Sequence, residues 1–114
     1  MNAPHRYTLS IPLNVRDLNT IEIPWEEIQF EDYQITKTDY DNLFELFCQF
    51  DQPFDIIIDE YEEEEIPADK IQTAIEMTEA YSSKSSTDVK TSANKLLVAL
   101  QRAKELGKPL ELFF

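Results

Sequence analysis

Apolar and polar positions follow a two-residue period near the start of the chain and a helical period further along. Residues 7–11 alternate and predict a strand that Pro12 ends. Because proline has no backbone N–H to donate, we expect this strand at the edge of its sheet. A second short strand is predicted at residues 20–23, stopped by Pro24. Residues 25–37 mix apolar and acidic positions and are expected to be irregular, with room for one further strand.

A first helix is predicted at residues 39–50. Thr38 is a suitable N-cap, and Asp39 and Asp41 favour the positive end of the helix dipole. The helical spacing gives one buried face made of Leu43, Leu46, Phe47 and Phe50, which Phe44 and Cys48 widen.

Pro53 is expected to break the chain after this helix. Three consecutive isoleucines then predict a central strand at residues 54–59, buried on both of its faces. The acidic run at 59–65 is expected to lead from that strand into a second helix, which begins at Pro67 and ends near Tyr81. The predicted buried stripe of this helix is Ile71, Ala74, Ile75 and Thr78.

The last third of the chain predicts a long helix followed by a strand. A serine-rich linker at residues 82–86 precedes a helix at 87–106, and Gly107 and Pro109 are a strong stop signal for it. A final strand is predicted at residues 110–114. The inward positions of the helix are expected to be Val89, Ala93, Leu96, Leu97, Leu100 and Ala103.

This order of elements predicts one α+β domain spanning residues 1–114. About three helices should pack on one face of a small mixed sheet, and the domain should end in a helix-Gly-strand unit. The strands at 54–59 and 110–114 are expected to be neighbours, joined by a crossover of two helices. A chain of 114 residues is long enough to bury a core of its own.

Charge adds information that the hydrophobic pattern does not contain. The net charge is −13, but residues 17–79 alone hold 20 acidic side chains against two lysines, Lys37 and Lys70. Nucleic acids and anionic membranes are recognised by clustered Lys and Arg, so both are disfavoured as partners. One interpretation is a solvated acidic face. The other is an electric field that attracts and holds a basic partner.

Residues suited to catalysis or to metal binding are few. His5 is the only histidine and lies near the start of the chain, while Cys48 is the only cysteine and lies on the predicted apolar helix face. Gly107 is the only glycine, which excludes a phosphate-binding glycine loop. A calcium loop starting at Asp59 fails because its sixth and twelfth positions are Glu64 and Lys70. We therefore expect no enzyme, no cofactor and no metal.

Cellular location is inferred from the same features. A single cysteine fits a reducing compartment, and the residues before the first strand lack the apolar stretch of a signal peptide. The longest apolar run is too short to span a membrane. We expect a cytoplasmic protein.

Aromatic residues inside the acidic stretches mark candidate partner-binding surfaces, because Trp and Tyr are enriched at interface hot spots and carboxylates accept bonds from Arg and Lys. Trp25 could instead belong to the core, and Glu64 and Glu65 could serve a helix N-terminus. The candidates of the first patch are Trp25, Glu26, Glu27, Glu31 and Asp32. Those of the second are Asp59, Glu60, Tyr61, Glu62, Glu63, Glu64 and Glu65. A secondary set on the first helix is Asp39, Tyr40, Asp41 and Glu45.

The C-terminal stretch LLVALQRAKELGKPLELFF, residues 96–114, resembles the endings of bacterial toxin-immunity proteins, in which a long helix passes through a glycine into a final strand. Size and acidity are similar to immunity proteins of contact-dependent growth inhibition and other polymorphic toxin systems. Barstar-like inhibitors are a looser comparison, from which the run at 59–65 and the helix at 67–81 depart.

The resemblance implies a protein that binds and neutralises a basic toxin domain, a nuclease, with carboxylates standing in for phosphates. The alternative is a phage-type mimic of nucleic acid, such as an anti-restriction or anti-CRISPR protein. A mimic should space its carboxylates along an extended surface, whereas an immunity protein needs one compact patch. A small enzyme and an inert structural domain are less favoured.

Overall fold

The computed structural model describes residues 7–18, 23–59 and 63–114, so most of the strand expected at 20–23 lies outside the described residues. Along this part of the chain the elements are β1 (Tyr7–Pro12), the 3-10 turn η1 (Trp25–Glu27), β2 (Phe30–Ile35), α1 (Lys37–Phe54), β3 (Glu63–Ile66), the 3-10 turn η2 (Ala68–Lys70), α2 (Ile71–Ser83), α3 (Thr87–Leu106) and β4 (Leu110–Phe113).

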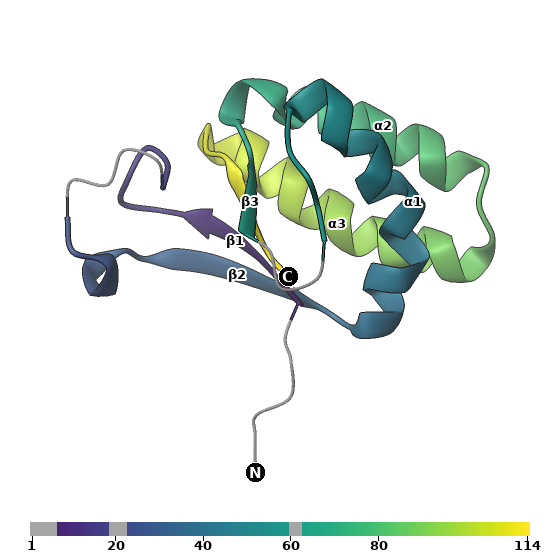
Figure 1. The fold of residues 1–114 in the computed structure, drawn as a ribbon, viewed down its shortest axis with the longest axis horizontal. Helices are drawn as coiled ribbons and strands as arrows, with labels where there is room; N and C mark the ends of the chain where they lie inside the picture. The colour runs from purple at the N-terminus through teal and green to yellow at the C-terminus, as the bar shows by residue number, and fades with distance from the viewer. Residues whose placement is uncertain (1–6, 19–22, 60–62) are drawn as a thin grey trace, which may run out of the picture.

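The four strands form one sheet in the order β2-β1-β4-β3, and every neighbouring pair is antiparallel. The three helices lie together on one side of this sheet, with α3 in contact with β1, β2 and β4 (Figure 1). The α+β class, the three helices on one face and the C-terminal helix-Gly-strand are therefore confirmed, although the sheet is antiparallel where a mixed one was expected. Two helices that run back and forth between β3 and β4 return the chain in the opposite direction, which explains the antiparallel pairing.

The core lies between the sheet and the helices. Leu9 and Ile11 on β1 and Leu110 and Leu112 on β4 point into it and are almost completely buried. All four predicted inward residues of α1 have no exposed surface: Leu43, Leu46, Phe47 and Phe50. The side chains of these strands alternate, so the opposite face of the sheet carries the polar residues between them.

The position of β1 differs from the prediction. This strand is not at the edge: it pairs with β2 on one side and with β4 on the other. Pro12 is tolerated because β4 pairs with β1 only at Thr8, Leu9 and Ser10, so the missing N–H of Pro12 removes no bond on that side.

The start of α1 also differs from the prediction. Thr36, not Thr38, is the N-cap: its hydroxyl accepts a bond from the N–H of Asp39, whose carboxylate accepts one from the N–H of Thr36. This reciprocal arrangement is a capping box, and α1 begins at Lys37, two residues before the predicted start. Phe44 and Cys48, expected to widen the buried face of α1, are exposed.

The central strand predicted at residues 54–59 is wrong. α1 continues through Pro53 to Phe54, and Asp55 then ends the helix in the left-handed conformation, with φ of 54°. The isoleucines that follow are in no described strand, and Ile57 is 70% exposed. A high β-propensity does not form a strand where no neighbour is available to pair with it.

The strand in this part of the chain is formed by the acidic run. Glu63–Ile66 is β3, which pairs with β4, whereas the run was expected to lead directly into a helix. Pro67 caps the 3-10 turn η2, and α2 begins only at Ile71. The neighbour of β4 is therefore β3 and not the isoleucine segment.

The last two helices agree closely with the prediction. The buried residues of α2 are the four predicted ones, and those of α3 include most of the predicted set, with Ser92 and Ala99 in place of Val89 and Leu97. Gly107 adopts the left-handed conformation after α3, with φ of 67°. Glycine has no Cβ atom and adopts this conformation without a steric clash, so it ends a helix effectively.

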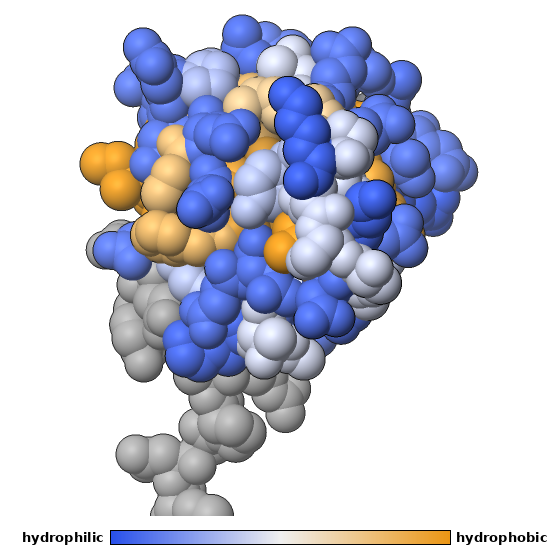
Figure 2. All heavy atoms as spheres, turned by 90° about the vertical axis from the view of Figure 1, so that its right-hand side faces the viewer, coloured by the Kyte–Doolittle hydropathy of each residue, from blue (hydrophilic) through white to orange (hydrophobic). Residues whose placement is uncertain are grey.

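Most of the side of the molecule that faces right in Figure 1 is hydrophilic, with apolar side chains gathered toward one edge (Figure 2). The large apolar residues exposed in the described chain are Leu13, Trp25, Phe44, Ile57 and Val98. Among the described helices, none combines the length and the apolar character that a bilayer crossing needs.

Candidate functional site

A row of polar side chains crosses the sheet on the face away from the helices. In register, Asp32 on β2 lies beside Ser10 on β1, Ser10 beside Glu111 on β4, and Glu111 beside Glu65 on β3. Register partners on neighbouring strands point to the same face, so the four side chains form one line. The hydroxyl of Ser10 donates a hydrogen bond of 2.6 Å to Oδ1 of Asp32.

Glu111 is the most unusual member of this row because a carboxyl group is rarely buried. Only 4% of its surface is exposed. Burial, the hydrogen bond with Glu65 and the negative charges of Glu65, Asp17 and Glu63 raise the pKa of Glu111 to about 10. The pair of Glu65 and Glu111 therefore holds a proton at neutral pH. Oε1 of Glu111 is buried, and the carboxyl group as a whole is hydrogen-bonded to Glu65.

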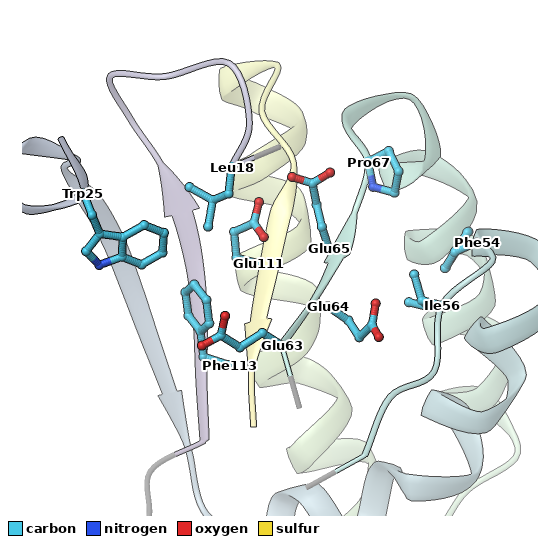
Figure 3. A pocket seen from close by; sticks show the side chains of 10 residues that line it. All are labelled: Leu18, Trp25, Phe54, Ile56, Glu63, Glu64, Glu65, Pro67, Glu111 and Phe113. Carbon is cyan, nitrogen blue, oxygen red and sulfur yellow. The ribbon is translucent and has the colours of Figure 1, made fainter. Parts of the chain in front are cut away.

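The two carboxyl groups of this pair line a cavity of about 430 Å³ at the β3 end of the sheet. Its walls come from β3, from β4, from the connection after β1 and from the segment that follows α1. Figure 3 shows Glu63, Glu65 and Glu111 on one side of the sheet, with Leu18 above Glu111 and Phe113 below it. The lining residues are Leu18, Trp25, Phe54, Ile56, Glu63, Glu64, Glu65, Pro67, Glu111 and Phe113.

Trp25 brings a large aromatic surface to this cavity. It lies in η1, is 51% exposed, and packs its ring against Phe30, with 5.9 Å between the ring centroids. Phe30 in turn packs edge-on against Phe113 at 6.0 Å. Trp25 is therefore outside the core and is held in place by other aromatic rings, which leaves much of its own ring open to solvent.

The structure thus brings together parts of the two acidic patches that the sequence presents separately. Trp25 from the first patch and Glu63, Glu64 and Glu65 from the second line the same cavity. Glu26 and Glu27 are exposed beside Trp25 in η1. Trp25 therefore lines the same cavity as carboxylates from a distant segment of the chain.

Other residues of the first patch have partners inside the protein. Glu31 lies half-buried on the opposite face of β2, where Arg102 Nε on α3 is 2.9 Å from its Oε2. Hydrogen bonds from Tyr33 and Arg102 lower the pKa of Glu31. Asp32 is exposed and accepts the bond from Ser10. Glu31 therefore links β2 to α3 through an ion pair with Arg102, and it does not line the cavity.

The secondary candidates on α1 do not form one surface. Asp39 is buried, completes the capping box and lies 2.7 Å from Lys95 Nζ, while Tyr40 belongs to the core. Treating these two residues as part of an exposed patch was wrong, because the capping box and the aromatic core turn them inward. Asp41 and Glu45 are exposed, and Asp41 is 3.3 Å from Lys37 Nζ one turn away.

Cys48 lies on the exposed side of α1, not on its apolar face. Local burial and the charges of Asp51, Glu45 and Asp59 raise the pKa of its thiol, which keeps it protonated and weakly nucleophilic. Asp59 is exposed. The remaining candidates lie outside the described residues: His5, Glu60, Tyr61 and Glu62.

Sequence reasoning missed Glu111 as a site residue. One signal was available: Glu111 is a lone acidic residue in an otherwise apolar strand, and alternation puts it on the face opposite Leu110 and Leu112. Its pairing with Glu65 could not be read from the sequence, because register between distant strands is not a local property. Leu18 and Phe113 were missed for the same reason.

The glutamates of β3 have a structural role as well. Within the described chain β3 pairs on one side only, and charged side chains on such an edge prevent unwanted strand pairing. This protection of the sheet edge explains the charge on β3 but not the buried carboxyl group of Glu111 or the exposed ring of Trp25.

In the described ranges, no group of three or more His, Cys, Asp or Glu side chains is placed to hold a metal ion.

Comparison of the chain with protein-family models, with curated proteins and with solved structures gave no match.

Proposed function

We propose that the protein is an immunity protein that binds a basic protein toxin domain, a nuclease, and blocks it without catalysis. The observation that supports this most strongly is the cavity that an exposed tryptophan lines together with the carboxyl groups of β3 and β4. Tryptophan is the residue most enriched at interface hot spots, and a carboxylate rim selects a basic partner.

The charge distribution supports the same proposal. Residues 17–79 carry a charge of −18; within that segment Glu63 is exposed and lines the cavity, and Glu26 and Glu27 are exposed next to Trp25 in the sequence. A nuclease must hold phosphates and therefore presents a basic surface. Complementary fields accelerate encounter to about 10⁸–10⁹ M⁻¹s⁻¹ at low salt, and fast capture is what neutralising a toxin requires.

The alternative is a phage-type mimic of nucleic acid that uses the same carboxylates on a restriction or CRISPR complex. A mimic needs carboxylates spaced like phosphates along an extended path. In this protein Trp25 and residues 63–65 line a single cavity. Such a compact binding surface favours the immunity proposal.

The test is capture of the C-terminal domain encoded by the adjacent upstream gene, followed by inhibition of its nuclease activity at increasing salt. We expect a tight complex whose association rate falls steeply with ionic strength. Capture of a restriction or CRISPR complex, with no binding to the upstream product, would favour the mimic instead.

Matched variants distinguish binding through the cavity from an effect of the net negative charge of the whole protein. Glu63→Lys with Glu64→Lys should slow association at least ten-fold, whereas Glu76→Lys with Glu79→Lys, exposed on α2, makes the same change in net charge away from the cavity. Equal slowing by both pairs would show that only net charge matters. Trp25→Ala should weaken binding by more than about 2 kcal/mol, as expected for a hot-spot residue.

A further inference from the structure

The two edges of the sheet differ in their protection against pairing with a further strand. β3 has only four residues, three of them glutamate, and Pro67 follows it. Short length, charge and proline are features with which natural proteins protect an edge strand. β2 has six residues, contains no proline or lysine, and pairs with β1 without a bulge. Within the described chain no strand pairs with its other side, so β2 is the less protected edge (Figure 1).

The hydrogen-bond register shows which backbone groups of β2 point to this edge. The N–H of Leu13 donates a hydrogen bond of 2.7 Å to the carbonyl oxygen of Gln29, the residue opposite it when the register of β1 and β2 is continued. In an antiparallel ladder, pairs that exchange hydrogen bonds alternate with pairs that do not, so the odd-numbered residues of β2 bond β1. The even-numbered residues direct their N–H and C=O groups away from β1: Phe30, Asp32 and Gln34.

Side chains on both faces of β2 define which strand fits beside it. On the face away from the helices, Asp32 is exposed. On the helix face, Arg102 of α3 balances the charge of Glu31, and Val98, one turn before Arg102, is 46% exposed. Because the side chains of a strand alternate, a strand added here would place basic side chains beside Asp32 and apolar ones toward Tyr33 and Val98.

We propose that β2 binds an extended segment of the basic partner as a fifth strand of the sheet, with basic and apolar side chains alternating along that segment. Main-chain hydrogen bonds supply the affinity, and the alternating side chains supply the specificity. A second copy of this chain does not fit, because pairing two β2 strands would join molecules that each carry a net charge of −13 and would bring acidic side chains together. Strand addition at β2 deepens the proposed function and rests on it for the source of the segment.

The β2 edge is continuous with the cavity. Phe30, the first residue of β2, packs its ring against Trp25, with 5.9 Å between the ring centroids. Trp25 lines the cavity together with Glu63 of β3. A segment bound along β2 with one end beside Phe30 therefore lies next to Trp25, so one partner contacts the edge and the cavity at the same time.

Hydrogen exchange of the free protein tests the open edge. We expect the amides of Phe30, Asp32 and Gln34 to exchange about ten-fold or more faster than those of Glu31 and Tyr33, which bond β1. Equal protection of all five amides would mean that the edge is already covered, which would overturn the proposal. Protection of the three outward amides that increases with protein concentration would identify a second copy as the occupant and would overturn it as well.

The probe for strand addition is the peptide acetyl-Lys-Val-Lys-Val-Lys-amide. When nine-tenths of the protein is bound, exchange of the three outward amides of β2 should slow by about ten-fold. The same peptide methylated at every backbone nitrogen cannot donate to β2 and should give no protection. Replacing its lysines by glutamate should weaken binding by about ten-fold or more. No protection by the lysine peptide, equal protection by its methylated form, or equal binding of the glutamate peptide would each overturn the proposal.

Variants test the backbone and the charge of β2 separately. Gln34→Pro removes an outward N–H and no bond to β1, so it should fold and weaken binding of the lysine peptide by about ten-fold. Unchanged binding by the folded variant would contradict the assignment. Asp32→Asn should weaken binding by about two- to five-fold and gives a second test if Gln34→Pro fails to fold. Its matched control is Asp69→Asn, exposed in η2 at the opposite edge of the sheet, which should bind as the wild type does.

Strand addition and the proposed function fail separately. If the upstream toxin domain is captured and inhibited but the outward amides of β2 are not protected in that complex, the assignment of β2 is wrong and the immunity function stands. If the lysine peptide adds to β2 but no toxin is captured, the immunity function is wrong and β2 remains a binding site for basic extended segments.

Discussion

Glu65 on β3 and Glu111 on β4 face each other across the antiparallel ladder, two acidic side chains at directly paired positions. Like charges at such positions destabilise a sheet, and here one of them is also buried. The protein tolerates the pair by retaining a proton on it. The stability of the fold is therefore linked to the protonation of this pair.

Replacing Glu111 by glutamine should stabilise the protein at neutral and alkaline pH. The pKa of Glu111 is raised from 4.5 to about 10 in the folded state, so its contribution is fully present below pH 4.5 and is lost as the pH rises through the folded value. Relative to Glu111→Gln, the wild type should lose stability as the pH increases, by up to about 1.4 kcal/mol per pH unit.

The measurement is urea unfolding of both proteins from pH 4 to pH 9. Glu76→Gln, which also removes one negative charge, controls for the effect of net charge. Parallel stability curves for the wild type and Glu111→Gln would show that Glu111 is ionised in the folded protein.

Asp39→Asn should destabilise the fold by about 1–3 kcal/mol, because Asp39 completes the capping box of α1 and accepts charge-assisted bonds. Burial opposes its ionisation, but hydrogen bonds from Lys95, Thr36 and Ser92 outweigh it and lower the pKa of Asp39 to about 2. This stabilisation is present above pH 3.8 and is lost as the pH falls through 2.

Thermal unfolding between pH 2 and pH 7 checks this prediction. Asp41→Asn is the control, since its exposed pair with Lys37 should contribute less than about 0.5 kcal/mol. A smaller effect at Asp39 than at Asp41 would contradict the role of the capping box.

Glu31→Gln should lower the pKa of Tyr33. The phenol of Tyr33 donates a hydrogen bond of 2.6 Å to Oε2 of Glu31, and this bond raises the pKa of Tyr33. Without a carboxylate acceptor, the pKa of Tyr33 should move down toward 10. An NMR titration of the tyrosine ring signals measures this pKa, and a double-mutant cycle with Arg102→Ala should give a favourable coupling between Glu31 and Arg102.

Gly107→Ala should cost about 1–2 kcal/mol through backbone strain alone. Gly107 has φ of 67°, and a Cβ added there would meet nothing within 4 Å. Gly107→Asn should cost less, because asparagine tolerates the left-handed conformation better. Chemical denaturation distinguishes the two, and equal losses for alanine and asparagine would point to a cause other than φ.

Features that depend on neighbouring residues were predictable from the sequence. The buried stripe of α2, the length of α3 and its end at Gly107 follow from helical spacing and from the chemistry of helix termination. Strand pairing is not local. The isoleucines after α1 have a higher β-propensity than the glutamates of β3, but the glutamates are the ones placed beside β4.

The same distinction applies to the candidate site. Charge and aromatic content identify Trp25 and the acidic run at 59–65 as surface candidates from the sequence alone. That Trp25 and β3 line one cavity depends on where the connection between β1 and β2 places Trp25, which is a property of the tertiary structure. The contribution of Glu111 depends on the register between β4 and β3, which no sequence period encodes.

The position of β4 between β1 and β3 determines when the site can form during folding. β1 is made early in synthesis and β4 late, and the contacts between them, such as Leu9 with Leu112, span almost the whole described chain. Before β4 inserts, β3 has no described strand to pair with, and Glu65 has no carboxyl group opposite it. Closing such long loops is slow relative to helix formation. A chain interrupted before residue 110 would lack Glu111 and Phe113 and the strand that pairs with β3, so the cavity can form only after β4 has inserted between β1 and β3.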